Sequence, residues 1–284
     1  MTNNSEKLVR YILMGVAFSA ISSLALIALF ILKEGLPFIL EEGLSTFLFS
    51  SDWDPQTGKF GIFPMIVASL WVTVGAMIIG APLGIAGAVY LVEFMPRSVM
   101  RVTKPLIELL AGIPSVVYGF IGVTVLAPLI RAYWGGPGLS VLAASIILGI
   151  MILPTVMSIS ADAISVVPNS YREGSLALGA TRWQTEYMVV LKAAKSGIIA
   201  GVILGMGRAI GETMAVIMVA GNAVKIPGSI FDSVRTLTAN IALEMGYASG
   251  RHRQALFATG VVLFVVIMVL NSVATWSIRT KIRK

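Results

Sequence analysis

Two charged residues, Arg208 and Glu212, stand alone in an otherwise uncharged stretch of the chain, residues 196–224. Twelve uncharged residues precede Arg208 and twelve follow Glu212, so each flank spans roughly 18 Å as a helix. The pair is therefore predicted near the middle of a membrane-spanning helix. A guanidinium at that depth suits an oxyanion, since it can bind two oxygens at once. Glu212 would hold or shield Arg208 when no anion is present, and Thr213 would donate a further hydrogen bond.

Two interpretations of this pair are open. Arg208 and Glu212 could form an ion pair that only locks helices together, although this order along a helix is the weaker one. A charge in lipid costs at least about 2.5–3.5 kcal/mol, which favours a role in a solute path. A helical projection places both charges on a glycine-rich face, whose members are Gly197, Gly201, Gly205, Gly207 and Gly211. That face is predicted to point into protein or an enclosed path, because small residues let another helix approach.

A second candidate for the path is Ser115, which follows Gly112-Ile113-Pro114. Proline after glycine predicts that a helix begins at Pro114. The free N–H groups of such a helix start attract anions. A plain kink between a helix on the inner face and the next membrane helix is the simpler alternative.

The composition shows which elements must position these residues. Of the 284 residues, 57% are hydrophobic and only 12% are charged, against roughly 25% charged in soluble domains. Such a chain is neither soluble nor disordered, and membrane lipid is its expected surroundings. The sequence has no cysteine and a single histidine, so no disulfide and no His- or Cys-rich metal site is expected. No basic stripe with interleaved aromatic residues is present, so no nucleic-acid partner is expected.

Long apolar stretches predict an all-α polytopic membrane protein with six transmembrane helices, because a helix needs about 20 apolar residues to cross the membrane. Five stretches contain no acidic or basic residue, and the sixth contains only the Arg208 and Glu212 pair. The six stretches are 11–32, 60–92, 109–130, 132–161, 196–224 and 255–278. The first is too long for the roughly 7–15-residue core of a secretion signal, so we expect it to be retained.

The distribution of lysine and arginine predicts the orientation. The two ends and the second and fourth loops carry 13 such residues, and the opposite side carries seven. Both termini are therefore expected in the cytoplasm, as parts of a multi-pass protein of the cytoplasmic membrane. Residues 1–61 are expected to form the first helix and an outer amphipathic segment. That segment is predicted to contain a short surface helix and a turn at Asp54-Pro55. It would lie on the membrane or dock an external partner.

The cytoplasmic loop, residues 162–195, belongs to a predicted core of residues 62–284. From Ser170 its pattern is that of a short amphipathic helix, which Gly179 should end in the left-handed conformation. Glu173, Gly179, Val189 and Leu191 resemble the coupling signature of ABC-transporter permeases. In that signature Glu-Ala-Ala is followed after three residues by Gly, and here Gly174, Ser175 and Lys192 depart from it. The residues implied to couple are Arg172, Glu173, Leu176, Ala177, Gly179, Ala180 and Thr181.

Other segments narrow the resemblance. Residues 107–119 and 207–216 are similar to phosphate-specific permeases, and residues 60–62, 171–173 and 235–239 resemble the PstC-type subunit. The resemblance implies the fold of a type I ABC importer permease and the import of inorganic phosphate. It also implies three protein partners, namely a PstA-type permease, a dimer of PstB-type ATPases and an external PstS-type phosphate-binding protein.

The chain itself is expected to be no enzyme and to hold no cofactor. It lacks a G-x-x-x-x-G-K-[ST] loop, so ATP and Mg are assigned to the ATPase partner. Three rival functions are weighed against phosphate import. One is a permease for another oxyanion, such as sulfate or molybdate, and another is a passive channel. The third is an intramembrane enzyme that uses Glu212 as a base, against which the lack of a paired nucleophile argues.

Overall fold

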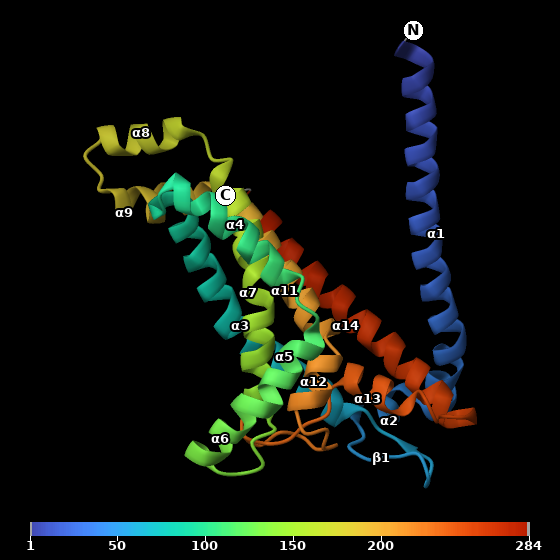
Figure 1. Cartoon of the computed structure of the whole chain (residues 1–284). Coiled ribbons are helices and arrows are strands. Elements are labelled where there is room, and N and C mark those ends of the chain that lie inside the picture. Colours follow the sequence, from blue (N-terminus) through green and yellow to red (C-terminus); the bar gives the residue numbers. More distant parts are fainter. Residues whose placement is uncertain (1, 283–284) are drawn as a thin grey trace.

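The computed structural model describes residues 2–282. Arg283 and Lys284, two basic residues of the predicted tail, lie outside the described residues. The described chain is almost entirely helical (Figure 1). The elements in chain order are α1 (Thr2–Glu42), α2 (Leu44–Phe49), β1 (Trp53–Asp54), β2 (Lys59–Phe60), α3 (Phe63–Val89), η1 (Tyr90–Phe94), α4 (Arg97–Ala111), α5 (Ser115–Ile121), η2 (Gly122–Leu126), α6 (Ala127–Trp134), α7 (Val141–Ser165), α8 (Asn169–Ala177), α9 (Arg182–Thr185), η3 (Glu186–Val190), α10 (Leu191–Ala193), α11 (Lys195–Gly211), α12 (Met214–Val219), α13 (Leu237–Glu244) and α14 (Gly250–Ile282). The η elements are π-helical.

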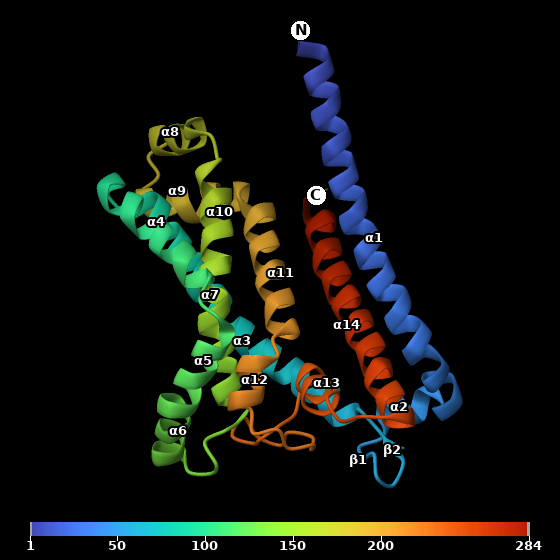
Figure 2. The same ribbon diagram turned by 45° about the vertical axis from the view of Figure 1, so that its right-hand side comes forward.

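The predicted membrane helices are confirmed in type, and their number is five, or six when a bent pair is counted as one span. Five helical segments are long and apolar enough to cross a membrane, namely Glu6–Glu42, Phe63–Phe94, Ser115–Trp134, Val141–Ser165 and Gly250–Val273. A bent pair, Arg182–Ala193 and Lys195–Gly211, supplies a sixth, with an angle of 71° between its halves. Its second half, α11, runs along α7, whereas its first half lies across the end of the bundle near α8 (Figure 2).

Glycines allow the central helices to touch. A Cβ on Gly80 of α3 would lie 2.6 Å from the carbonyl oxygen of Gly149 on α7. A Cβ on Gly205 of α11 would lie 2.8 Å from the Val156 side chain, also on α7. Helices in lipid gain little from burying apolar surface, so such close contact supplies much of their attraction. The helix α7 therefore packs closely against both α3 and α11.

The outer segment differs from the prediction. The helix α1 continues to Glu42 as one helix, with Pro37 inside it, so the predicted surface helix is reduced to α2. The turn at Asp54-Pro55 is confirmed, because β1 and β2 pair across it and Asp54 Oδ2 accepts a hydrogen bond of 2.8 Å from Thr57 Oγ1.

The apolar side chains of this segment divide into two groups, because Leu40, Leu44 and Phe49 are at least 60% exposed whereas three phenylalanines face protein. Phe38, Phe47 and Phe60 are at most 4% exposed, and they pack with Leu237 of α13 and Ala255 of α14. The ring centroids of Phe38 and Phe60 lie 5.3 Å apart, edge to face. The segment is therefore a small core at one end of the bundle.

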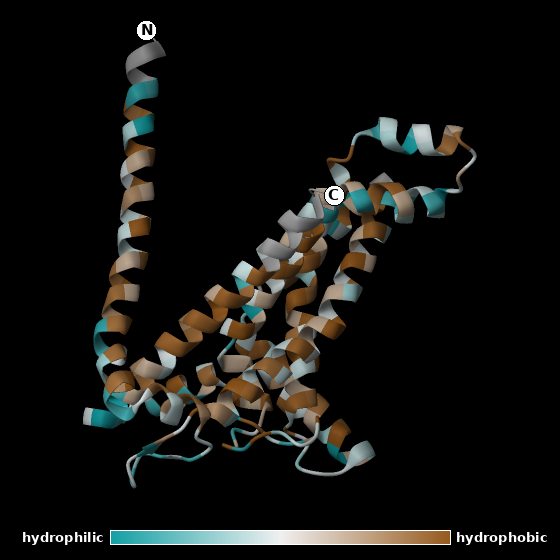
Figure 3. Ribbon diagram, turned by 180° about the vertical axis from the view of Figure 1, so that it is seen from behind, coloured by the Kyte–Doolittle hydropathy of each residue, from teal (hydrophilic) through white to brown (hydrophobic). Residues whose placement is uncertain are grey.

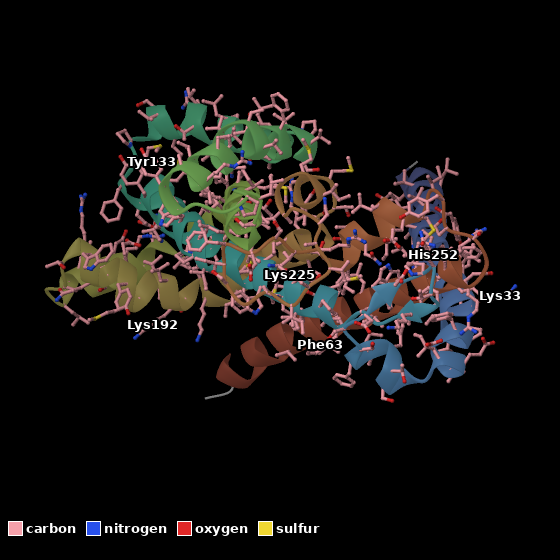
Figure 4. All side chains as sticks on the ribbon, turned by 90° about the horizontal axis from the view of Figure 1, so that it is seen from below. Lys33, Phe63, Tyr133, Lys192, Lys225 and His252 are labelled. Atoms are coloured by element: carbon pink, nitrogen blue, oxygen red, sulfur yellow. The ribbon has the colours of Figure 1, made fainter. Side chains whose placement is uncertain are left out.

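The two ends of the molecule are distinct. The N-terminus, the end of α14 and the helix α8 lie toward one end (Figures 1 and 2). The hairpin β1–β2, α6 and the loops around α13 lie at the other. Hydrophobic residues predominate between the ends, and hydrophilic ones gather at α8, α9 and the loops (Figure 3). Viewed from the loop end, His252 and Lys33 lie near one edge and Lys225 lies nearer the centre (Figure 4).

This polarity predicts labelling from opposite sides of the membrane. Ser45 on α2 and Ser165 at the end of α7 are both exposed, and the chain has no native cysteine. In Ser45→Cys and Ser165→Cys variants, an impermeant thiol reagent should modify only one of the two in intact cells. Inside-out vesicles should give the reverse pattern. Modification of both cysteines from the same side would contradict this arrangement.

Candidate functional site

Arg208 connects three helices near the middle of the bundle. It lies in the last turn of α11, and its side chain is half-buried. Its Nη1 donates a hydrogen bond of 3.2 Å to Thr155 Oγ1 on α7. Its Nη2 donates one of 3.3 Å to the carbonyl oxygen of Ala111, the last residue of α4. Both acceptors are neutral, and no salt bridge is found for Arg208 among the described residues.

The ion pair between Arg208 and Glu212, one of the two interpretations left open by the sequence, is not formed. The helix α11 ends at Gly211, and Glu212 takes an extended conformation with φ −69° and ψ 130°. The four-residue spacing therefore no longer brings the two side chains together. Glu212 Oε1 instead accepts a hydrogen bond of 3.1 Å from the backbone N–H of Ala215, in the first turn of α12. The carbonyl oxygen of Glu212 accepts one of 3.0 Å from Thr238 Oγ1.

Thr213 and Ser115 mark two breaks in the helices. Thr213 lies between α11 and α12 and donates a hydrogen bond of 3.3 Å to the carbonyl of Gly211, so it is bound locally. Ser115 is the first residue of α5, which confirms the helix start predicted at Pro114 to within one residue. The contact from Arg208 to Ala111 brings the two breaks next to each other.

Beyond the breaks, α5 and α12 pack closely. A Cβ on Gly119 of α5 would lie 3.1 Å from the Cα of Ala215 and 2.7 Å from the sulfur of Met218. The two short helices are therefore in contact as a pair. Irregular backbone at membrane depth is tolerated where protein or a water-filled cavity surrounds it.

The glycine face of α11 is divided in two. Gly197, Gly201 and Gly205 lie against α7, where an added Cβ would approach Ala163, Ile159 and Val156. Gly207 and Gly211 have no atom within 4 Å of an added Cβ, so they face open space. The prediction that small residues admit a neighbouring helix is confirmed for the first three. Arg208 lies at the border between these two faces.

The predicted coupling helix is present as α8. Gly179 follows it with φ +85°, the left-handed conformation expected there. Thr181 begins α9 with a capping box, in which Thr181 and Gln184 exchange hydrogen bonds of 3.2 and 2.8 Å. Glu173, Leu176 and Ala177 are exposed, and Leu178 is 90% exposed. A helix with exposed leucines outside the membrane presents a surface for a partner.

Arg172 points inward from α8 and differs in this from its neighbours. Its Nε donates a hydrogen bond of 3.2 Å to Glu93 Oε1 on η1, and its Nη1 donates one of 2.7 Å to the carbonyl of Val167. Glu186 of η3 lies in the same cluster and is 6% exposed. Sequence analysis missed Glu93 and Glu186. The available signal was Glu93 itself, a single acidic residue directly after the apolar stretch 60–92.

A second missed cluster lies at the loop end. Glu244 is 6% exposed and accepts hydrogen bonds of 2.7 Å from Arg235 and 2.9 Å from Trp53 Nε1. The Nε2 of His252, the single histidine, lies 2.8 Å from Glu244 Oε2, the oxygen that also accepts from Trp53. The cluster borders an open cavity of about 870 Å³. It ties the hairpin, α13 and α14 together.

Comparison with known proteins identifies the family. The model of the family described as "Binding-protein-dependent transport system inner membrane component" matches residues 80–283. The chain belongs to this family. It is thus a transport component and not an enzyme.

Relatives of this permease cover nearly its whole length. A probable ABC transporter permease protein of Bacillus subtilis, YqgH, is 46% identical and covers 90% of this chain and 85% of its own. The phosphate transport system permease protein PstC of Mesorhizobium japonicum is 37% identical and covers 94% of this chain and 90% of its own.

Solved structures share the fold of this permease. A chain of a bacterial alginate ABC transporter matches with a TM-score of 0.64, 16% identity, and coverage of 93% of this chain and 92% of its own. A chain of the MetNI methionine ABC transporter matches with a TM-score of 0.58 and 19% identity, and covers 78% of this permease and 94% of itself. These similarities confirm the expected type I importer fold.

The separate partners of Arg208 and Glu212 predict independent effects of mutation. We expect Arg208→Gln and Glu212→Gln each to shift the apparent unfolding temperature of the solubilised transporter. Expressed as changes in the free energy of unfolding, the two effects should add in the double variant to within about 0.5 kcal/mol, because independent sites are additive. Two residues in contact would show an interaction energy of about 0.5–3 kcal/mol. A measured interaction energy at the upper end of that range would contradict the separate partners and would indicate an ion pair between Arg208 and Glu212.

Proposed function

We propose that this permease is one membrane subunit of an ATP-driven importer of inorganic phosphate. Relatives named as phosphate transport system permeases support the substrate. The observation that carries the proposal is the charge of Arg208, which has only neutral hydrogen-bond partners among the described residues. A half-buried guanidinium without a carboxylate partner attracts an anion, and its planar fork fits two oxygens of phosphate.

The open side of α11 supports a second subunit opposite Arg208. Gly207 and Gly211 face empty space on that side, and Arg208 lies at its border. A PstA-type permease placed there would close a path between the two chains. Glu212, Thr213 and Ser115 lie at the adjacent helix breaks and would line this path through backbone and hydroxyl groups. The exposed part of α1, where Leu24 is 69% exposed, fits lipid or the same second subunit.

The end that carries α8 would face the cytoplasm. The excess of lysine and arginine on that side supports this orientation, and both termini lie toward the same end. In the labelling experiment above, the cysteine at Ser165 would then be the one protected in intact cells. The exposed residues Glu173, Leu176 and Ala177 would dock α8 on one subunit of a PstB-type ATPase dimer. ATP and Mg would be bound there.

At the opposite end the loops would receive a PstS-type phosphate-binding protein. The network of Glu244 with Arg235, Trp53 and His252 holds these loops in one arrangement. A preorganised surface binds a partner at a lower cost in conformational entropy.

Arg208→Lys tests the phosphate site. The variant keeps the charge but loses the planar fork, so phosphate uptake by cells should fall at least about tenfold with normal abundance. Arg131→Lys is the matched control, because Arg131 is exposed on α6 and donates only to the carbonyl of Pro137. Its uptake should equal that of the wild type. Native uptake by Arg208→Lys would refute the site, and transport of sulfate or molybdate instead of phosphate would refute the substrate.

Gly179 tests the docking of α8. A β-branched residue is strained at φ +85°, whereas asparagine accepts that conformation, and no atom lies within 4 Å of an added Cβ. Gly179→Val should therefore lower phosphate uptake strongly, while Gly179→Asn should retain most of it. Abundance in the membrane is measured for both variants. Equal uptake by the two variants would show that the left-handed helix end is not needed.

A further inference from the structure

The coupling helix α8 is attached to the membrane helices by very few contacts. None of its own residues is fully buried, and it stands apart from the bundle (Figure 1). Ser175 Oγ lies 2.9 Å from Thr185 Oγ1 on α9. The remaining polar contacts from α8 come from Arg172 alone, among the described residues. The helix α8 also packs against α9 and η3. Among its polar contacts, only those of Arg172 reach the ends of the membrane helices α3 and α7.

Arg172 binds two different membrane helices. Its Nε donates to both carboxylate oxygens of Glu93, at 3.2 and 3.3 Å, and its Nη2 also donates to Glu93. Glu93 lies on η1, the direct continuation of α3. The other donors of Arg172 reach the carbonyls of Ile164 at 3.2 Å and Val167 at 2.7 Å, at the end of α7. The side chains of Arg172 and Glu93 are only 17% and 11% exposed. Their geometry is therefore fixed by the surrounding protein.

Glu186 completes the cluster from a third element. It lines a small cavity of about 210 Å³ together with Glu93, Arg172 and Arg182. Its Oε2 atom is buried and has no hydrogen-bond partner. Both acids lie on π-helical turns, Glu93 on η1 and Glu186 on η3, and such turns are frequent at functional sites. The cluster thus places a second carboxylate beside the salt bridge of Arg172 with Glu93.

We propose that Glu93, Arg172 and Glu186 form the joint through which α8 moves α3 and η3 when the ATPase closes. Glu93 and Glu186 are then positioning residues of energy coupling, acting through Arg172. This inference rests on the proposed docking of α8 on an ATPase. The path continues from α3 to α7 through their glycine contacts, and from Thr155 on α7 to Arg208. The joint therefore links the docking helix to the proposed phosphate site.

The charge of Arg172 is fixed by its partner. Hydrogen bonding to Glu93 raises the pKa of Arg172, which stays charged. Arg182 lines the same cavity as Glu186, and Tyr90 and Tyr187 line the adjoining groove with it.

The test measures phosphate imported per ATP hydrolysed in proteoliposomes that contain the whole transporter and its binding protein. Glu93→Gln should lower this ratio at least about fivefold while ATP hydrolysis continues, because the charge that holds Arg172 is removed. Glu108→Gln, an exposed acid on α4, is the matched control and should keep the native ratio. If Glu93→Gln does not assemble, Arg172→Lys takes its place, with the same loss expected.

Glu186→Gln tests the third member of the joint. The variant removes the second carboxylate beside Arg172, so the ratio should fall at least about twofold with normal abundance in the membrane.

Three outcomes would overturn the joint. They are a native ratio in assembled Glu93→Gln or Arg172→Lys, a loss of abundance with an unchanged ratio, and a native ratio in assembled Glu186→Gln. Failure of the proposed function is distinguishable, because the wild-type transporter itself would then import no phosphate in the same vesicles.

Discussion

The hydrocarbon interior of the membrane contains no water, so backbone N–H and C=O groups there must find partners within the protein. This constraint explains why polar side chains gather where the helices break. Arg208 donates to the carbonyl of Ala111 at the end of α4, and Thr238 donates to the carbonyl of Glu212 after α11. The Glu212 carboxylate accepts the N–H of Ala215 at the start of α12. Each break is thus stabilised by a hydrogen bond between a side chain and the backbone.

The same absence of water removes most of the hydrophobic attraction between helices, and close packing takes its place. Glycines on α3 and α11 let both helices approach α7 closely. A gap in this pattern is informative, because Gly207 and Gly211 meet no neighbour in this chain. Part of the packing surface of α11 is therefore left open within this chain, on the side where we propose a second subunit.

The two ends of the permease differ in how firmly they are held. At the loop end, three phenylalanine rings and the network around Glu244 join α1, the hairpin, α13 and α14. At the other end, α8 is held chiefly through Arg172. A firmly held loop end suits the proposed docking of an external binding protein. A helix α8 with few attachments suits the proposed movement by an ATPase at the other end. The helix α7 lies between them and touches both the Arg172 contacts and Arg208.

The sequence by itself determined the features that depend on neighbouring residues. Uncharged stretches located the membrane helices, because hydropathy is a local property. Gly179 located the end of α8 and Asp54-Pro55 located the turn of the hairpin, because backbone preference is local too. Only the tertiary structure decided which polar groups meet. Arg172 and Glu93 are 79 positions apart, and the helix ends before Glu212 in a backbone bound by Thr238, 26 positions away. The burial of Phe38 and Phe60 likewise depends on α13 and α14. Such contacts are set by how the helices pack, which no local pattern contains.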